Sequence, residues 1–187
     1  MSDFTPIQMR SEISLVGLQD FCDFINSKFS ESPIESIVEI GSYTGESAVF
    51  FAKQFPNATI YCIDPWTPGY DDTDIASDSE FEVVEKMFDE RTKGYNIVKI
   101  KADSLHIDIE CDIVYIDGCH QYECVKDDIK YWKKRCSKAI AGHDYYPKEI
   151  ADQHPHIKGV REAVDELFSD QQIHTFADGS WLVIPVN

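Results

Sequence analysis

The chain has 187 residues, about the size of one ordinary domain, and hydrophobic residues make up 43% of it, which is enough for a substantial core. It has 17 Lys and Arg residues against 34 Asp and Glu residues, so its formal net charge is -17 at pH 7. A surface of that sign repels phosphate backbones and anionic lipids, which argues against nucleic-acid and membrane partners.

Targeting signals are also absent from the sequence pattern. No apolar run approaches the ~20 residues of a membrane span. Residues Met1 to Pro6 lack a basic patch followed by an apolar stretch, so a secretory signal peptide is not expected. The 6 cysteines form no C-x-x-C pair, and without a secretion signal we expect reduced thiols. These features predict a cytoplasmic protein.

Short apolar segments with strand character alternate along the chain with longer segments of helical periodicity. The expected helices are 15–29, 45–55, 81–91, 121–134 and 160–168. The expected strands are 36–40, 58–63, 96–100, 112–116, 138–141, 172–176 and 181–186. The strand at 112–116 is apolar almost throughout, as in parallel strands that are covered on both faces. The last two strands are joined by a tight turn, which indicates an antiparallel hairpin.

This order predicts an α/β fold: a Rossmann-like three-layer α/β/α sandwich with a seven-stranded, mostly parallel sheet and a C-terminal antiparallel hairpin. We expect one domain over residues 1–187, in which 1–33 form a leading helical segment. Ligands of such sheets bind beyond the carboxyl ends of the strands. The residues just after each strand are therefore the candidates for function.

The first of these turns leads from strand 36–40 into the next helix. Gly41 and Gly45 would let the backbone approach a ligand closely, and the start of the helix offers free N–H groups. Tyr43 stands where a dinucleotide-binding G-x-G-x-x-G would require glycine. Glu39, just before the turn, would oppose a bound phosphate and favour a cationic ligand.

The spacing Glu39-x-Gly41-x-x-x-Gly45 resembles the first motif of class I S-adenosylmethionine-dependent methyltransferases, whose cofactor carries a sulfonium and an amino group. Ser42 and Tyr43 then belong to the cofactor-binding turn. A helix-packing glycine turn in another Rossmann-like protein is the alternative.

Two further turns carry the same resemblance. It implies that Asp64, at the end of the second strand, accepts hydrogen bonds from the ribose hydroxyls, although an Asp before proline also caps helices. Trp66 is expected near the adenine or in the cleft, or simply in the core. In the family, the turn holding Asp103 and Ser104 carries a polar group that meets the adenine amine, but Asp-Ser is also ordinary turn chemistry.

The segment from Pro65 to Ser79 is rich in Asp and Pro. This composition is typical both of a mobile lid over a cofactor and of a solvated acidic loop, and the sequence favours neither.

The most distinctive segment runs from Asp112 to Tyr122. Within it, Ile116-Asp117-Gly118-Cys119-His120-Gln121-Tyr122 resembles the Ile-Asp-Gly-x-His-x-Tyr signature of a methyltransferase subgroup, methyltransferase domain family 24. That subgroup includes macrolide-sugar O-methyltransferases and cephalosporin-hydroxylase-like proteins. Ala141 to Tyr145 and Gly159 to Val164 fit the same pattern. The resemblance covers about residues 34–170 and does not specify a substrate.

Several members of this group bind magnesium through acidic residues after the fourth and fifth strands. Carried over by position, the matching carboxylates are Asp117 and Asp144, with His143 where some relatives have an acid. Imidazole suits softer metals, so the resemblance implies Mg²⁺ or another divalent cation, against an equal alternative of no metal. Asp117 is expected to contact the cofactor as well.

Two histidines are candidates for the general base. His120 is the first, because the ordinary pKa of histidine lets it take a proton near neutral pH, and His143 is the second. The alternative for His120 is a structural role in the Asp117 turn. His154 and His156 flank Pro155 in an expected flexible loop, where they could border the substrate.

The resemblance thus implies S-adenosylmethionine-dependent methylation of a small molecule, with an oxygen acceptor and with or without metal assistance. The expected partner is the small-molecule acceptor, and homo-oligomer formation is left open. The alternatives are a non-catalytic adenosylmethionine-binding Rossmann-like protein and a nicotinamide-dependent oxidoreductase. The missing third glycine argues against the latter.

Overall fold

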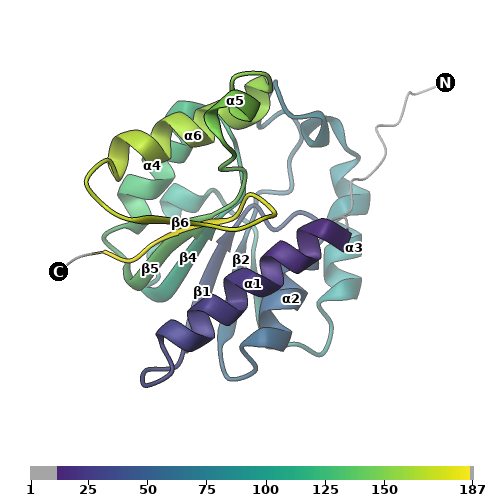
Figure 1. Cartoon of the computed structure of the whole chain (residues 1–187). Helices are drawn as coiled ribbons and strands as arrows, with labels where there is room; N and C mark the ends of the chain where they lie inside the picture. Colours follow the sequence, from purple (N-terminus) through teal and green to yellow (C-terminus); the bar gives the residue numbers. More distant parts are fainter. Residues whose placement is uncertain (1–11, 186–187) are drawn as a thin grey trace.

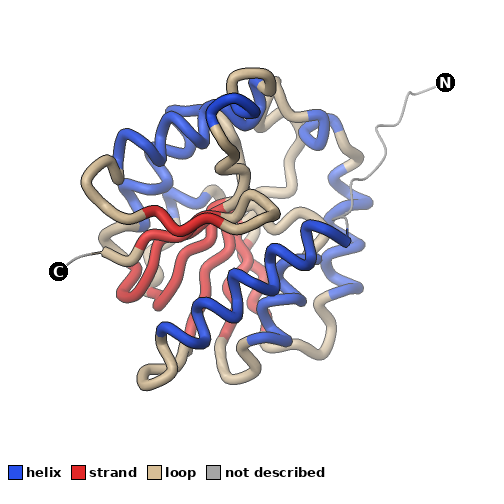
Figure 2. Tube along the Cα trace, viewed as in Figure 1, coloured by secondary structure: helices blue, strands red, loops and turns tan. Residues whose placement is uncertain are grey.

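A seven-stranded sheet forms the middle layer of the fold, and helices cover both of its faces (Figures 1 and 2). These elements are seen in a computed structural model that describes residues 12–185. Residues 1–11, where no signal peptide was expected, lie outside the described residues, as do residues 186 and 187 at the end of the last predicted strand.

All the predicted helices and strands are present, most of them with shifted ends. The helices are α1 (Glu12–Lys28), α2 (Glu46–Gln54), α3 (Phe81–Arg91), α4 (Tyr122–Trp132), α5 (Lys148–Ala151) and α6 (Pro155–Leu167). The strands are β1 (Ser36–Ile40), β2 (Thr59–Ile63), β3 (Ile97–Ile100), β4 (Cys111–Ile116), β5 (Cys136–Gly142), β6 (Ile173–Thr175) and β7 (Trp181–Val183). Two short 3-10 helices are η1 (Ile75–Asp78) and η2 (Ser104–His106).

The largest difference in bounds lies at the start of α6. His154 is the N-cap of this helix and Pro155 its first residue, so the flexible loop expected around them is wrong. Proline at the first helical position is favourable, because its missing N–H has no intrahelical partner to lose there. The sequence pattern had placed the start later, at Val160.

The strands follow the order β3-β2-β1-β4-β5-β7-β6. Strands β1 to β5 run parallel to one another, whereas β7 is antiparallel to both β5 and β6. This arrangement confirms the mostly parallel sheet with a C-terminal antiparallel hairpin. The strand order reverses between β1 and β4, and the carboxyl ends of these two strands therefore frame the crevice in which such sheets bind ligands.

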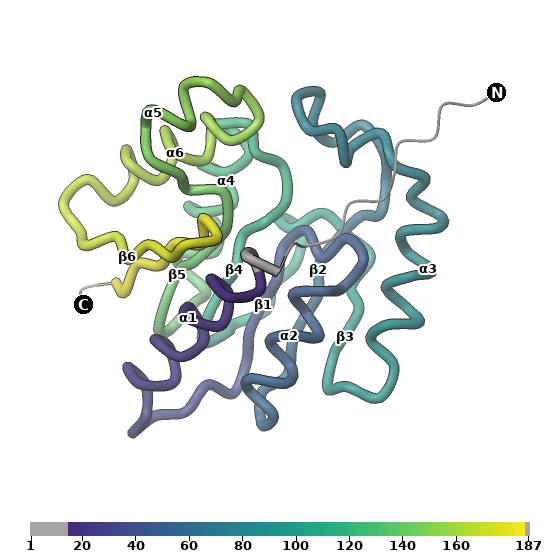
Figure 3. Tube along the Cα trace, turned by 45° about the vertical axis from the view of Figure 1, so that its right-hand side comes forward, coloured from purple at the N-terminus to yellow at the C-terminus, as the bar shows by residue number. Residues whose placement is uncertain are grey.

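The helices divide between the two faces of the sheet (Figure 3). Helices α1, α2 and α3 pack on one face, and α4 and α6 pack on the other. Successive side chains of β4 alternate between the two cores: Tyr115 packs with the first group and Val114 with the second. Burial on both faces explains why this strand is apolar almost throughout.

Two further features of the fold bear on the sequence analysis. All 6 cysteines are free, and Cys22, Cys62 and Cys111 are buried. Within residues 12–185, no helix combines the length and the apolar character that crossing a bilayer requires.

Candidate active site

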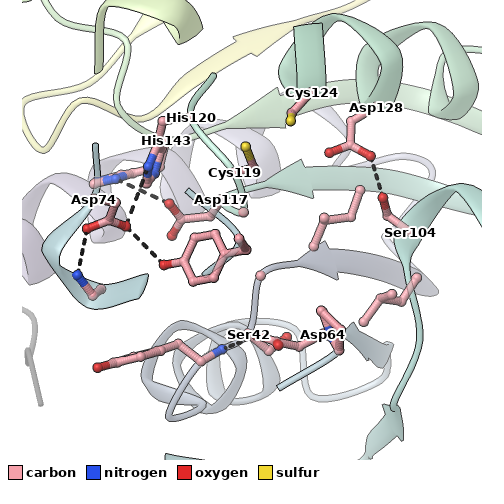
Figure 4. A pocket seen from close by; sticks show the side chains of 18 of the residues that line it. Ser42, Asp64, Asp74, Ser104, Asp117, Cys119, His120, Cys124, Asp128 and His143 are labelled. Carbon is pink, nitrogen blue, oxygen red and sulfur yellow. Dashed lines mark hydrogen bonds and ion pairs between the residues drawn. The ribbon is translucent and has the colours of Figure 1, made fainter. Parts of the chain in front are cut away.

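A cavity of about 1080 Å³ lies at the carboxyl edge of the sheet. The turn after each of β1 to β5 contributes a polar side chain to it, namely Ser42, Asp64, Ser104, Asp117 and Asp144 in that order. The first four of these are labelled in Figure 4. None of the described residues that line it is Lys or Arg, whereas many are Asp or Glu. The cavity therefore has a negative potential, which favours a cationic ligand.

Gly41 is required by the contact between two of these turns. It has a φ of +81°, and a Cβ atom there would lie 2.6 Å from both the carbonyl carbon of Asp117 and the Cα of Gly118. The two turns are also joined by the N–H of Asp117, which donates to the carbonyl of Ile40 at 2.8 Å. The close backbone approach expected at Gly41 is thus an approach to the Asp117 turn, and it brings both turns into one cavity wall.

Asp64 ties the first turn to the second. Its carboxylate accepts the N–H of Tyr43 at 2.9 Å and the N–H of Trp66 at 2.6 Å. Burial raises the pKa of this carboxyl, although the two N–H groups act in the opposite direction. Asp64 lines the cavity and caps no helix, so the capping alternative is not the role seen.

Three of the expected cofactor residues are not among those that line the cavity: Glu39, Gly45 and Trp66. Trp66 is only 3% exposed, and its ring lies 4.8 Å from that of Phe88 between centroids. Its indole N–H donates to the carbonyl of Tyr43 at 2.9 Å. Trp66 is therefore a core residue, and its hydrogen bond to Tyr43 supports the first turn from the core side.

The third turn separates the roles of two neighbouring residues. The carboxylate of Asp103 accepts the N–H of Leu105 at 2.9 Å and so caps η2, with its side chain 59% exposed. Ser104 instead donates its hydroxyl proton to Asp128 of α4 at 2.5 Å. Asp128 also lines the cavity and is only 6% exposed. Burial raises its pKa to about 6.

Asp128 should make the stability of the protein depend on pH. Because its folded pKa of about 6 lies above the ordinary value of 3.8, the folded state holds the proton more tightly than the unfolded state. The contribution of this proton to the free energy of unfolding is largest at and below about pH 4 and is lost as the pH rises through 6. From pH 4 to 7.5 we expect the wild type to lose about 2 kcal/mol relative to Asp128→Asn. Urea unfolding of both proteins measures this; a pH-independent difference would contradict it.

A cluster of acids and histidines occupies the other part of the cavity (Figure 4). His120 Nε2 lies 3.0 Å from one carboxylate oxygen of Asp144, and His143 Nδ1 lies 3.2 Å from the other. His143 Nδ1 is also 3.6 Å from Asp117. The left-handed backbone of Asp144, with a φ of +62°, directs its carboxylate between the two imidazoles.

Asp117, His120 and Asp144 each offer a metal-ligand atom, and the three atoms lie within 4.8 Å of one another. Such spacing fits ligands of one divalent cation. The resemblance implies His143 as the imidazole ligand, whereas the imidazole in this group is that of His120. His143 lies beside it and contacts both carboxylates.

The charge state of His120 follows from its neighbours. Burial disfavours the charged imidazole, but the carboxylates of Asp144, 3.0 Å from Nε2, and of Asp71, 3.6 Å from Nδ1, outweigh it and raise the pKa of His120 well above its usual value. An imidazolium has no lone pair to take a proton from a substrate. The expected role of His120 as a general base thus requires that the imidazolium first lose its proton.

The segment from Pro65 to Ser79 folds over the cluster and is anchored there. Asp71 is 1% exposed and accepts the backbone N–H of His120 at 2.9 Å. Gln121 donates to Asp72 at 2.8 Å, and η1 lies within the segment. A merely solvated acidic loop is therefore wrong. The segment is a structured cover, whose mobility stays a prediction.

A family model described as a methyltransferase domain matches residues 38–145, more than half of the chain. The chain belongs to this methyltransferase family. The matched residues run from β1 to just beyond Asp144, and thus include every turn that builds the cavity. The match confirms the resemblance to class I methyltransferases drawn from the sequence.

Solved structures share the fold of this methyltransferase at low identity. A candidate caffeoyl-CoA O-methyltransferase from Staphylococcus aureus is 13% identical, with a TM-score of 0.62 over 95% of this chain and 93% of that one. The plantazolicin methyltransferase BpumL, solved with SAH, is 14% identical, with a TM-score of 0.61 over 94% and 86%. The magnesium protoporphyrin IX methyltransferase of Synechocystis PCC 6803, solved with bound SAM, is 9% identical, with a TM-score of 0.60 over 96% and 86%. No curated protein sequence matches the chain.

Two residues of this methyltransferase site were missed from its sequence. Asp71 lies in the cover segment and Asp128 lies on α4, and neither follows a strand. Asp128 stands next to Ile129 on the otherwise apolar face of α4, where both are buried. A charged residue within that apolar stripe was the available signal, because buried carboxylates usually serve a defined contact.

Proposed function

We propose that this methyltransferase binds S-adenosylmethionine across the turns after β1 to β4 and transfers its methyl group to an oxygen of a small molecule. The observation that carries the proposal is the cavity in which these turns meet, lined by carboxylates without a Lys or Arg. The sulfonium and ammonium groups of the cofactor are positive, so such a wall attracts them. The presence of SAH or SAM in two structures of the same fold supports this ligand.

The turns suggest an orientation for the cofactor. The methionine part would lie over Gly41 and Ser42, where the backbone is open to the cavity, and Asp64 would accept the ribose hydroxyls. Ser104 would lie beside the adenine. This places the sulfur beside the Asp117 turn, on the side of the acid and histidine cluster.

The cluster supports a bound divalent cation. Two carboxylates and one imidazole, from Asp117, Asp144 and His120, suit a transition metal better than Mg²⁺, because imidazole is a softer ligand than oxygen. A cation held there would supply positive charge that lowers the pKa of an acceptor hydroxyl. His143 and the Asp71 contact to His120 would keep the ligands in place.

The transfer itself is an in-line displacement. The acceptor oxygen forms a bond to the methyl carbon while the sulfur leaves with the electron pair of the broken C–S bond. The acceptor proton passes to a base, for which His143 is the candidate in this cavity when His120 holds its own proton or would ligate the cation. The residues of the chain contribute chiefly by holding acceptor and methyl group in line.

Asp64→Ala should weaken S-adenosylhomocysteine binding by roughly 10- to 100-fold, since a buried acceptor for two hydroxyls is lost. The same change leaves the backbone N–H groups of Tyr43 and Trp66 without their acceptor, so it also lowers the free energy of unfolding. Asp64→Asn keeps one acceptor oxygen and separates these effects, because its stability should recover more than its affinity. Calorimetry and urea unfolding of both variants test this; unchanged affinity in Asp64→Ala would remove Asp64 from the site.

Turnover assays test the function as a whole. The protein is incubated with methyl-labelled S-adenosylmethionine and a panel of sugar, phenol and carboxylate acceptors, with and without a chelator. Label in a hydroxyl-bearing acceptor supports the proposal, and its loss in chelator supports the cation. Cofactor binding without transfer to any acceptor class would instead favour the non-catalytic alternative.

A further inference from the structure

The contact between Ser104 and Asp128 lies at the opposite end of the cavity from the histidines (Figure 4). It joins η2 to α4, and Asp128 is 94% buried with the Ser104 hydroxyl as its hydrogen-bond partner. The charges that act on it are those of Asp103 and Asp127, which are repulsive. The chain thus holds a carboxylate in an unfavourable position against one hydroxyl group of the site.

The direction of this hydrogen bond is determined by chemistry. An ionised carboxylate has no proton to donate, so the Ser104 hydroxyl must donate to Asp128. Its oxygen then presents only lone pairs to the cavity. The carboxylate of Asp103, the neighbour of Ser104 in the same turn, also lines the cavity and is an acceptor as well. This end of the cavity consequently favours a ligand group that donates hydrogen bonds.

We propose that Asp128 is the residue that determines base specificity in this methyltransferase: by fixing Ser104 as an acceptor, it selects a purine with an amino group at position 6. This inference rests on the proposed binding of S-adenosylmethionine, whose base would lie at Ser104. A 6-oxo purine would place its own acceptor against Ser104 and near the carboxylate. An unpaired or repelled buried acceptor lowers affinity by roughly 10- to 100-fold.

Without Asp128 the discrimination disappears. A leucine has a similar branched shape but accepts no hydrogen bond, so in Asp128→Leu the Ser104 hydroxyl is free to rotate and donate to a 6-oxo group. In Asp128→Asn the amide oxygen can still accept the Ser104 proton, so much of the preference is kept. Asp127→Leu is the matched control, because Asp127 is the exposed neighbour on the same helix and also borders the cavity.

The test is a calorimetric titration of S-adenosylhomocysteine and S-inosylhomocysteine into the wild type and these variants. We expect the wild type and Asp127→Leu to prefer the adenosyl ligand by about 30-fold or more, and Asp128→Leu by less than about 3-fold. The change should come mainly from tighter inosyl binding, with Asp128→Asn intermediate. A Ser104→Ala variant, which removes the acceptor itself, should also lose the preference and serves if Asp128→Leu does not fold.

Several results would overturn the inference. A full preference retained in Asp128→Leu and Ser104→Ala, or an equal loss in Asp127→Leu, would show that Asp128 does not set it. A wild type that binds both ligands equally well would also overturn it while leaving the proposed cofactor in place. A wild type that binds neither ligand would overturn the proposed function, and this inference with it.

Discussion

Replacing Gly41 with alanine should abolish measurable S-adenosylhomocysteine binding and lower the free energy of unfolding by about 3 kcal/mol. Two effects combine at this position. The residue has a φ of +81°, a backbone conformation that is strained for alanine. The Cβ of the alanine would also overlap backbone atoms of Asp117 and Gly118. Backbone cannot rotate out of the way as a side chain can, so the turns after β1 and β4 must separate. Calorimetry measures the loss of binding, and urea unfolding the loss of stability.

Gly94 offers the matched control for this variant. It has a φ of +85°, but a Cβ there would meet nothing within 4 Å. Gly94→Ala should therefore lose only about 1 kcal/mol from backbone strain and bind the ligand normally. Equal effects of the two substitutions would show that strain alone matters, and that the contact between the two turns does not build the site.

Asp144→Asn should lower kcat roughly 100-fold or more while changing S-adenosylhomocysteine affinity less than about 3-fold. Asn tolerates the left-handed backbone of this position, where φ is +62°, so the fold should be retained. The carboxylate that lies between His120 and His143 loses its charge, which disrupts both the acceptor proton path and the candidate cation site. Steady-state kinetics and calorimetry separate the two effects.

Asp127→Asn is the control for charge alone, since Asp127 borders the same cavity but lies outside the cluster. We expect its turnover to match that of the wild type. A calorimetric titration of Mn²⁺ or Zn²⁺ should show binding to the wild type that Asp144→Asn weakens. Full turnover of Asp144→Asn would refute a catalytic role for the cluster. Full wild-type turnover in the presence of a chelator would refute a requirement for a bound cation.

The fold could be predicted from the sequence because its signals are local. The apolar strand at β4 and the helical spacing of Val125, Ile129 and Trp132 in α4 each report burial within one segment. The turns after the strands were found for a related reason: parallel strands place their carboxyl ends at one edge, wherever they lie in the chain. Gly41, Asp64, Ser104 and Asp117 follow from this rule.

The remainder of the site depends on contacts between distant segments. Asp71 and His120 are 49 positions apart in the sequence, and Asp128 and Ser104 are 24 apart. No local sequence pattern therefore predicts either contact. The exchange of His143 for His120 in the candidate metal group has a similar origin. The backbone conformation of Asp144 decides where its carboxylate lies, and residue spacing alone does not reveal that conformation.

Binding of S-adenosylmethionine in the cavity at the ends of β1 to β4 is tested most directly by calorimetry. S-adenosylhomocysteine is titrated into the wild-type protein, and NAD is titrated in parallel. The structure predicts one binding site with a Kd on the order of micromolar or tighter for S-adenosylhomocysteine, and no binding of NAD. Micromolar binding of NAD without binding of S-adenosylhomocysteine would contradict the account.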